Sequence, residues 1–181
     1  VSLVSCNTEA TGLVEIPQSI KISGANYKVV AIENNAFKNC VSMTKVIISE
    51  NIRKIGHLIF INCPSLTAID WRAINCPLEG SPYGDWMVCS QSAYCPDYDS
   101  DHTNAFIYNI TEFTFGDKVE HLPNHLCVHL RWDLVNHLPA SLKSMGSRPL
   151  PVGYAGDTLY CNATEPPAIE YFKFTDDEMS P

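Results

Sequence analysis

The sequence predicts a β-rich α/β fold, a solenoid of 23-residue repeats in which short strands alternate with short helical turns. The first observation is the period itself, because many side chains of residues 32–48 recur 23 positions later in residues 55–71. The recurring pairs are Ile32/Ile55, Phe37/Phe60, Asn39/Asn62, Cys40/Cys63, Ser42/Ser65 and Thr44/Thr67. This self-similarity is the signature of a repeat architecture, in which each coil buries its apolar edge against the next.

The second observation is an apolar spacing shared by distant blocks of the chain. Residues 48–55 and 115–122 each contain three apolar side chains separated by four and then by three positions. The two sets are Ile48, Ile52, Ile55 and Phe115, Val119, Leu122, and the second set returns after 23 residues as Leu138, Leu142, Met145. Two separated blocks that obey one rule indicate stacked copies of one unit.

Composition agrees with a compact protein. The 181 residues have a formal net charge of −8 and are 45% hydrophobic, which excludes intrinsic disorder and favours one domain. An acidic chain lacks the clustered cationic face that duplex nucleic acid requires, so no nucleic-acid partner is expected. The most apolar stretch, residues 57–61, is far shorter than the ~18 residues of a membrane span, so we expect no span in this chain.

The elements follow from this unit in order. Residues 20–29 add about nine residues to the period, and Gly24-Ala25-Asn26 predicts a hairpin turn there. Residues 34–40 and 57–63 form the longer arc of their coils, with about one helical turn each. Period-2 alternation predicts short strands that place every second side chain inward. The inward pairs are Val46/Ile48, Ile69/Trp71 and Phe113/Phe115.

A larger interruption separates two blocks of repeats. Residues 75–106 show no repeat signal and are rich in proline, glycine, cysteine and aromatic residues, which predicts a long ordered insertion. We expect a single domain over residues 1–181, with repeats at about 14–74 and 111–147. An acidic closing segment at 157–181 is expected to cap the array or to begin a linker.

The repeat units resemble a known family. IENNAFKNCVSMTKVII (32–48) and IGHLIFINCPSLTAIDW (55–71) are similar to the unit of BspA-like leucine-rich repeats, a family of bacterial cell-surface proteins. The resemblance covers about residues 14–74 and 111–169, and Glu33 replaces the glycine usual in the unit. It implies a surface-exposed or secreted protein whose roles are binding and adhesion, and it implies no cofactor. The chain begins at Val1 without a signal-peptide pattern, so we expect a processed or trimmed product.

The eight cysteines divide by position. Cys40 and Cys63 lie one period apart, and we expect buried thiols that act as small hydrophobic residues, with a disulfide between them as the alternative. Cys89 and Cys95 of the insertion, with Cys76 nearby, are the better disulfide candidates, because an extended loop in an oxidising compartment gains most from a covalent link.

Metal sites are weak hypotheses here. Cys76, Cys89, Cys95 and His102 lack the short ligand spacing of a zinc site. The histidines at 121, 125 and 129 are expected to face solvent, because Leu122 and Leu126 occupy the buried positions. Asp97, Asp99 and Asp101 begin like a calcium loop, but the glycine and the bidentate glutamate of an EF-hand are missing. We therefore expect no metal, with calcium at these three aspartates as the remaining candidate.

The aromatic residues of the insertion are the candidate binding residues. Tyr83, Trp86, Tyr94 and Tyr98 lie on a loop above a rigid scaffold, where binding hot spots occur, and the alternative is that they fold inward as a small core. No catalytic motif is present, so the chain is not expected to be an enzyme. We predict a recognition or adhesion module for an extracellular protein ligand. The alternatives are a glycan-binding module of a nutrient-capture system and a metal protein centred on residues 76–102.

Overall fold

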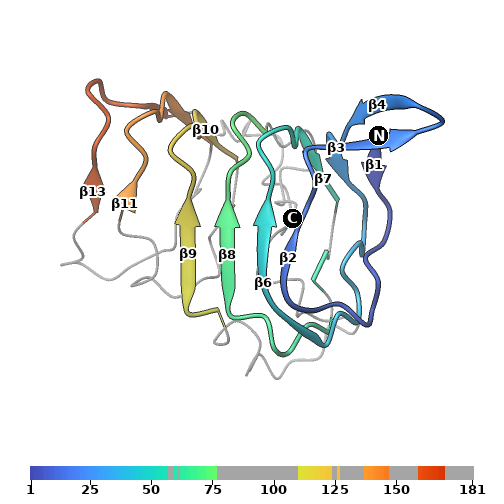
Figure 1. Ribbon diagram of the computed structural model, residues 1–181. Helices are drawn as coiled ribbons and strands as arrows, with labels where there is room; N and C mark the ends of the chain where they lie inside the picture. The colour runs from blue at the N-terminus through green and yellow to red at the C-terminus, as the bar shows by residue number, and fades with distance from the viewer. Residues whose placement is uncertain are drawn as a thin grey trace, which may run out of the picture.

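The computed structural model in Figure 1 describes residues 1–56, 59–60, 62–76, 110–123, 126, 137–146 and 159–169. Within these residues the chain forms strands and turns without a helix, and successive repeats place parallel strands side by side. The structure is therefore the strand-rich repeat fold that the sequence predicts. In the same part of the chain, no helix has the length and apolar character that a membrane span requires.

The longest strands of successive repeats form one parallel sheet. Its order is β2 (Thr11–Glu15), β6 (Ser42–Ile48), β8 (Ala68–Trp71) and β9 (Glu112–Phe115). Val46 lies opposite Ile69 and Ile48 opposite Trp71, so the 23-residue period is the register of the sheet. Beyond β9, the strands β11 (His137–Leu138) and β13 (Tyr160–Cys161) pair in parallel with the same period (Figure 1).

A second row consists of two-residue strands, one from each coil. Its two parallel groups are β1 (Ser2–Leu3), β5 (Ala31–Ile32), β7 (Lys54–Ile55) and then β10 (His121–Leu122), β12 (Ser144–Met145), β14 (Ala168–Ile169). An isolated bridge between Asn75 and His121 continues the row toward β10. Because β1 pairs with β5, the first coil begins at Ser2, twelve residues ahead of the first expected repeat.

The extra residues of the first coil form the expected hairpin. Val14 pairs with Val46, which is 32 positions away and nine more than the period. The nine residues belong to the antiparallel strands β3 (Ser19–Ile22) and β4 (Ala25–Lys28), which project from the end of the sheet in Figure 1. The turn lies at Ser23-Gly24, one residue before the predicted position. Both residues have positive φ values, 48° and 89°, as a type I′ hairpin turn requires.

The second irregularity lies between β8 and β9. These two strands pair directly, with Ile69 opposite Phe113 and Trp71 opposite Phe115. Equivalent positions are therefore 44 residues apart, as in the hydrogen bond from Thr111 Oγ1 to the carbonyl of Thr67. The connection between these neighbouring strands includes residues 77–109, which lie outside the described residues.

The arc of the second coil is a run of turns and not the helical turn that the sequence predicts. Three i→i+3 backbone hydrogen bonds close the turns, from Lys38 to Asn35 (2.9 Å), Cys40 to Phe37 (3.1 Å) and Ala36 to Glu33 (3.3 Å). Asn35 and Asn39 have φ values of 60° and 65°, and Asn62 repeats this at 54°. A helix cannot continue through a left-handed residue, and asparagine tolerates that conformation better than most residues.

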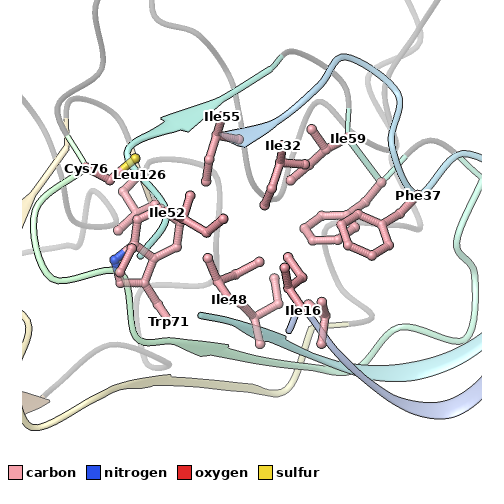
Figure 2. Close-up of a cluster of buried hydrophobic side chains, with 14 of the residues drawn as sticks. Ile16, Ile32, Phe37, Ile48, Ile52, Ile55, Ile59, Trp71, Cys76 and Leu126 are labelled. Atoms are coloured by element: carbon pink, nitrogen blue, oxygen red, sulfur yellow. The ribbon is translucent and has the colours of Figure 1, made fainter. Parts of the chain in front are cut away.

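The core lies between the two rows of strands. Figure 2 shows Ile32, Ile48, Ile52 and Ile55 pointing into a common interior, together with Phe37 and other apolar side chains of neighbouring coils. The four isoleucines are at most 5% exposed, which confirms the positions that the four-then-three spacing predicts. Each fully buried isoleucine or leucine contributes about 1.5–3 kcal/mol relative to an exposed one.

Candidate functional site

The paired strands of the four-stranded sheet give its solvent side a regular arrangement of side chains. Val46, Ile48, Ile69, Trp71 and Phe113 point inward and are buried. Since neighbouring residues of a strand point to opposite faces, the intervening side chains form the outer face. By register, the outer face has two rows: Leu13, Lys45, Ala68, Glu112 and then Glu15, Ile47, Asp70, Thr114.

The first row contains an ion pair that spans three strands. Lys45 on β6 and Glu112 on β9 flank Ala68 on β8, and Lys45 Nζ donates to Glu112 Oε1 at 2.7 Å. The small side chain of Ala68 lies in the same row between the two charged residues, and it is only 6% exposed. At the edge of the sheet, Leu13 completes this row as a largely exposed apolar residue.

The second row is polar and anionic. Arg72 follows β8, and its Nε and Nη2 atoms both donate to Asp70 Oδ2, at 2.9 and 2.6 Å. This hydrogen bond raises the pKa of Arg72, and the negative charges of Asp70, Glu15 and Glu50 raise it further. The guanidinium is thus held beside the sheet by Asp70, and the charges of Glu15 and Glu50 favour its protonated form.

Two further ion pairs join coils beside the sheet. Lys118 Nζ donates to Glu50 Oε1 at 3.0 Å, and this hydrogen bond raises the pKa of Lys118. Lys143 Nζ donates to Glu120 Oε1 at 2.7 Å, one period away. Exposed ion pairs of this kind contribute little to stability. Their regular placement matters more, because it gives the surface a defined charge pattern.

The charged side chains of this surface are paired with one another. A hydrolytic site would need a nucleophile next to a base that a third group orients, and the outer face instead contains carboxylates paired with Lys or Arg. Among the residues that the structure describes, no three His, Cys, Asp or Glu side chains come together as metal ligands.

The predicted binding residues lie outside the described residues. This applies to the aromatic set Tyr83, Trp86, Tyr94, Tyr98, to the aspartates Asp97, Asp99, Asp101, and to Cys89, Cys95 and His102. The structure does place the two ends of their segment. Cys76 and Ile110, the described residues on either side of positions 77–109, are buried in the core at 0% and 4% exposure.

The described cysteines are thiols. Cys40 and Cys63 are buried, as the period predicts, and Cys63 Sγ donates to the carbonyl of Phe37 at 3.0 Å. Cys76 lies in the core near Leu126 (Figure 2), and its proposed disulfide and zinc partners Cys89, Cys95 and His102 lie outside the described residues. Burial raises the pKa of all three thiols, to about 12 for Cys40 and Cys76 and about 11 for Cys63.

The prediction that the histidines at 121, 125 and 129 face solvent can be compared with the structure at His121. Leu122 and Leu126 are buried, which confirms the predicted register. His121, however, is half-buried, and its Nδ1 atom lies 2.7 Å from Ser144 Oγ, one period away. His125 and His129 lie outside the described residues.

Sequence reasoning missed three contacts between coils. Asn62 Nδ2 donates to Asn39 Oδ1 at 2.9 Å. Thr67 Oγ1 donates to the carbonyl of Thr44 at 3.3 Å, and the exposed rings of His137 and Tyr160 stack with centroids 4.9 Å apart. The recurrence of Asn39/Asn62 and Thr44/Thr67 at the period was the available signal, since equal positions of stacked coils are neighbours.

A comparison with models of protein families agrees with the repeat architecture. A family model described as "BspA type Leucine rich repeat region (6 copies)" matches residues 15–77. A search of the curated proteins found no match. Among solved structures, the chain is similar to a leucine rich cell surface protein from Faecalibacterium prausnitzii A2-165, at 15% identity and a TM-score of 0.37. That similarity covers 78% of this chain and 39% of the other, so this chain spans well under half of that protein's length.

Proposed function

We propose that the protein is a non-catalytic recognition module that binds a protein ligand at the cell surface or outside the cell, and the match of residues 15–77 to the BspA-type leucine-rich repeat model supports this proposal. The outer face of β2, β6, β8 and β9 is the proposed binding surface. The observation that best supports this proposal is the pattern of charged side chains on this face. Backbone pairing between the strands keeps these side chains at fixed distances from one another.

Size and charge favour a protein as the ligand. The four strands lie about 4.8 Å apart, so their outer face forms one part of the larger surface that a protein partner contacts. Charges of both signs at fixed positions give specificity and steer association, whereas a small ligand needs a concave site. Leu13 adds an exposed apolar contact at the edge.

The proposal also includes the finer organisation expected from the sequence. The coils form a continuous solenoid in one domain over residues 1–181, and residues 75–106 form an insertion on it. The direct pairing of β8 with β9 supports this arrangement, because the intervening segment adds no strand between them. Tyr83, Trp86, Tyr94 and Tyr98 of the insertion form a second, independent contact surface in this proposal.

The test is binding of the full chain to a panel of purified extracellular proteins, with a glycan array in parallel. Asp70→Arg places a cation beside Arg72 on the outer face. The control is Lys38→Glu, a charge reversal of opposite sign on the exposed arc. We expect a protein ligand whose Kd rises at least about tenfold with Asp70→Arg, a loss of about 1.4 kcal/mol, and is unchanged with Lys38→Glu.

A second arm separates the two surfaces. Deletion of residues 78–100 should weaken binding of the same ligand without unfolding the repeats, if the insertion is a contact surface. Equal binding by wild type and Asp70→Arg would exclude the outer face. Binding to glycans alone would replace the protein ligand with the glycan alternative.

A further inference from the structure

The first coil places a cysteine where later coils place a phenylalanine. The Cys6 amide donates to the carbonyl of Ala36 at 2.6 Å, and the Phe37 amide donates to the carbonyl of Ile59 at 2.8 Å. Ile59 lies one period after Ala36, so the two bonds are equivalent and Cys6 is the first-coil counterpart of Phe37. The exchange of a phenyl ring for a thiol brings a sulfur atom to the end of the core.

This sulfur lies beside that of Cys40. The thiols of Cys6 and Cys40 both donate to the carbonyl oxygen of Asn7, at 3.6 and 3.7 Å. Cys6 is half-buried and Cys40 is fully buried, so a small reagent reaches the pair through Cys6. Cys63 belongs to the next coil, and its thiol donates to the carbonyl of Phe37.

The two thiols also influence each other. Burial is the main cause that raises the pKa of Cys40 to about 12, and the hydrogen bond and charge of Cys6 contribute. A thiol with so high a pKa rarely ionises near neutral pH, so Cys40 is a poor first nucleophile. Its neighbour at the surface is the group that an oxidant meets first.

We propose that Cys6 and Cys40 are a redox-sensitive pair that forms an intrachain disulfide with a low-molecular-weight disulfide, such as oxidised glutathione, as the oxidant. The Cys6 thiolate attacks one sulfur of the oxidant, forms a mixed disulfide and releases one glutathione thiolate. Cys40 loses its proton to water when the chain end opens transiently. Its thiolate then attacks the sulfur of Cys6 and releases the second glutathione. The two cysteines are oxidised, and one oxidised glutathione is reduced to two thiols.

The bond would tie the first coil to the second. Residues 1–15 are held at the end of the stack by the pairing of β1 with β5 and of β2 with β6. In the described residues β1 and β2 are the edge strands of their sheets, and a segment that is paired on one side only opens most readily. A covalent link restricts the opened state, so the oxidised chain should unfold at a higher temperature than the reduced chain.

The experiment equilibrates the full chain with mixtures of oxidised and reduced glutathione at pH 8, followed by alkylation and non-reducing peptide mapping. We expect a linked peptide that contains Cys6 and Cys40 and a rise in the unfolding temperature, both reversed by excess reduced glutathione. Cys6→Ser should remove both effects. Cys161→Ser, at an exposed cysteine of the last described coil, is the matched control and should keep them.

Three results would overturn the proposal. They are a glutathione adduct that persists on Cys6 with Cys40 still alkylated, a link between Cys40 and Cys63 in place of Cys6, and full alkylation of both Cys6 and Cys40 at every ratio. If Cys6→Ser lowers the unfolding temperature of the reduced chain, peptide mapping of wild type still decides the question.

Discussion

At the scale of single residues, the positions next to the short strands determine how closely two coils approach. Gly56 follows β7, and its amide donates to the carbonyl of Ile32 at 2.7 Å. A Cβ atom at this position would overlap the backbone nitrogen of Asn34 and the carbonyl carbon of Glu33. Glycine is therefore required there by space, because the backbones of two coils are in direct contact.

Gly56→Ala should destabilise the protein by about 2 kcal/mol or more, since the clash is with backbone and cannot be relieved by a side-chain rotation. Urea unfolding followed by circular dichroism measures the change. Glu33 is the matched control, because its amide makes the equivalent bond to Leu3 and it carries a side chain at the same position. Glu33→Ala should cost less than about 1 kcal/mol. Similar losses for both variants would contradict the close approach at Gly56.

Asn39 and Asn62 show what the recurrence of one residue type at the repeat period means for the structure. Asn39 and Asn62 precede the two cysteines, and both have positive φ values. The sequence shows that the two asparagines recur but not which conformation they adopt, because asparagine occurs in helix caps, in turns and as a metal ligand. Only the backbone path, which must reverse before the next strand, selects the left-handed turn and stacks the two amides.

At the scale of elements, the hairpin is an addition to a regular coil. Every residue of β3 and β4 is exposed, including Ile20, Ile22 and Tyr27. If Ile20–Lys28 is left out of the count, Ile16, Val29 and Ile32 are separated by four and then by three positions. All three are buried, so the first coil obeys the same rule as the later coils.

Deletion of Ile20–Lys28 should therefore leave the fold intact. It joins Ser19 to Val29 and restores the spacing found between Ile48 and Ile55. We expect the free energy of unfolding to change by less than about 1 kcal/mol, because two-stranded hairpins contribute little stability alone. Thermal unfolding measures this. The matched comparison is deletion of nine residues at 42–50, which removes β6 and should prevent folding. A large loss from the hairpin deletion would show that it packs on the coils.

Elements differ in how far sequence could predict them. The hairpin and the inward strand positions follow from local patterns of turn residues and alternation. The arc of the second coil was wrongly expected to be helical, since its apolar residues have spacing that suits a helical turn and a chain of tight turns equally well. Cys76 shows the same limit, because nothing local distinguishes a buried cysteine of the core from one in a loop.

At the scale of the whole molecule, one core joins buried residues from Ile16 to Leu142. Cys40, Cys63 and Cys76 come from successive parts of the chain and lie in the same cluster of buried residues. Burial raises the pKa of each thiol above its ordinary value of 9.0, to between about 11 and about 12. In the folded protein they keep their protons at a pH where the unfolded chain loses them.

Alkaline pH should therefore destabilise the protein. Below about pH 9 these thiols are protonated in both states, and their contribution to stability is complete. As the pH rises from about 9 to about 12, unfolding releases protons and the free energy of unfolding falls, by about 1.4 kcal/mol per pH unit for the Cys76 thiol. Urea unfolding at a series of pH values measures the slope.

Cys76→Val isolates one of these groups. Valine is apolar and does not titrate, so the decrease of stability above pH 9 should be less steep by about 1.4 kcal/mol per pH unit. Ile69→Val, a core change without a titratable group, should lower stability equally at every pH and keep the wild-type slope. Equal slopes for wild type and Cys76→Val would mean that this thiol is not buried in the folded protein.

The sequence by itself determined the period, the inward positions and the strand-rich class, because every coil must bury the same apolar pattern against its neighbour. Only the tertiary structure decided which distant residues meet. The pairs Lys45 and Glu112, Cys6 and Cys40, and Trp71 and Phe115 depend on coils that are shortened or lengthened between them. Each such irregularity changes the number of residues between equivalent positions, so the 23-residue period no longer locates the partners beyond it. Contacts across it are therefore determined by the path of the chain in space, and a repeat read along the sequence does not contain that path.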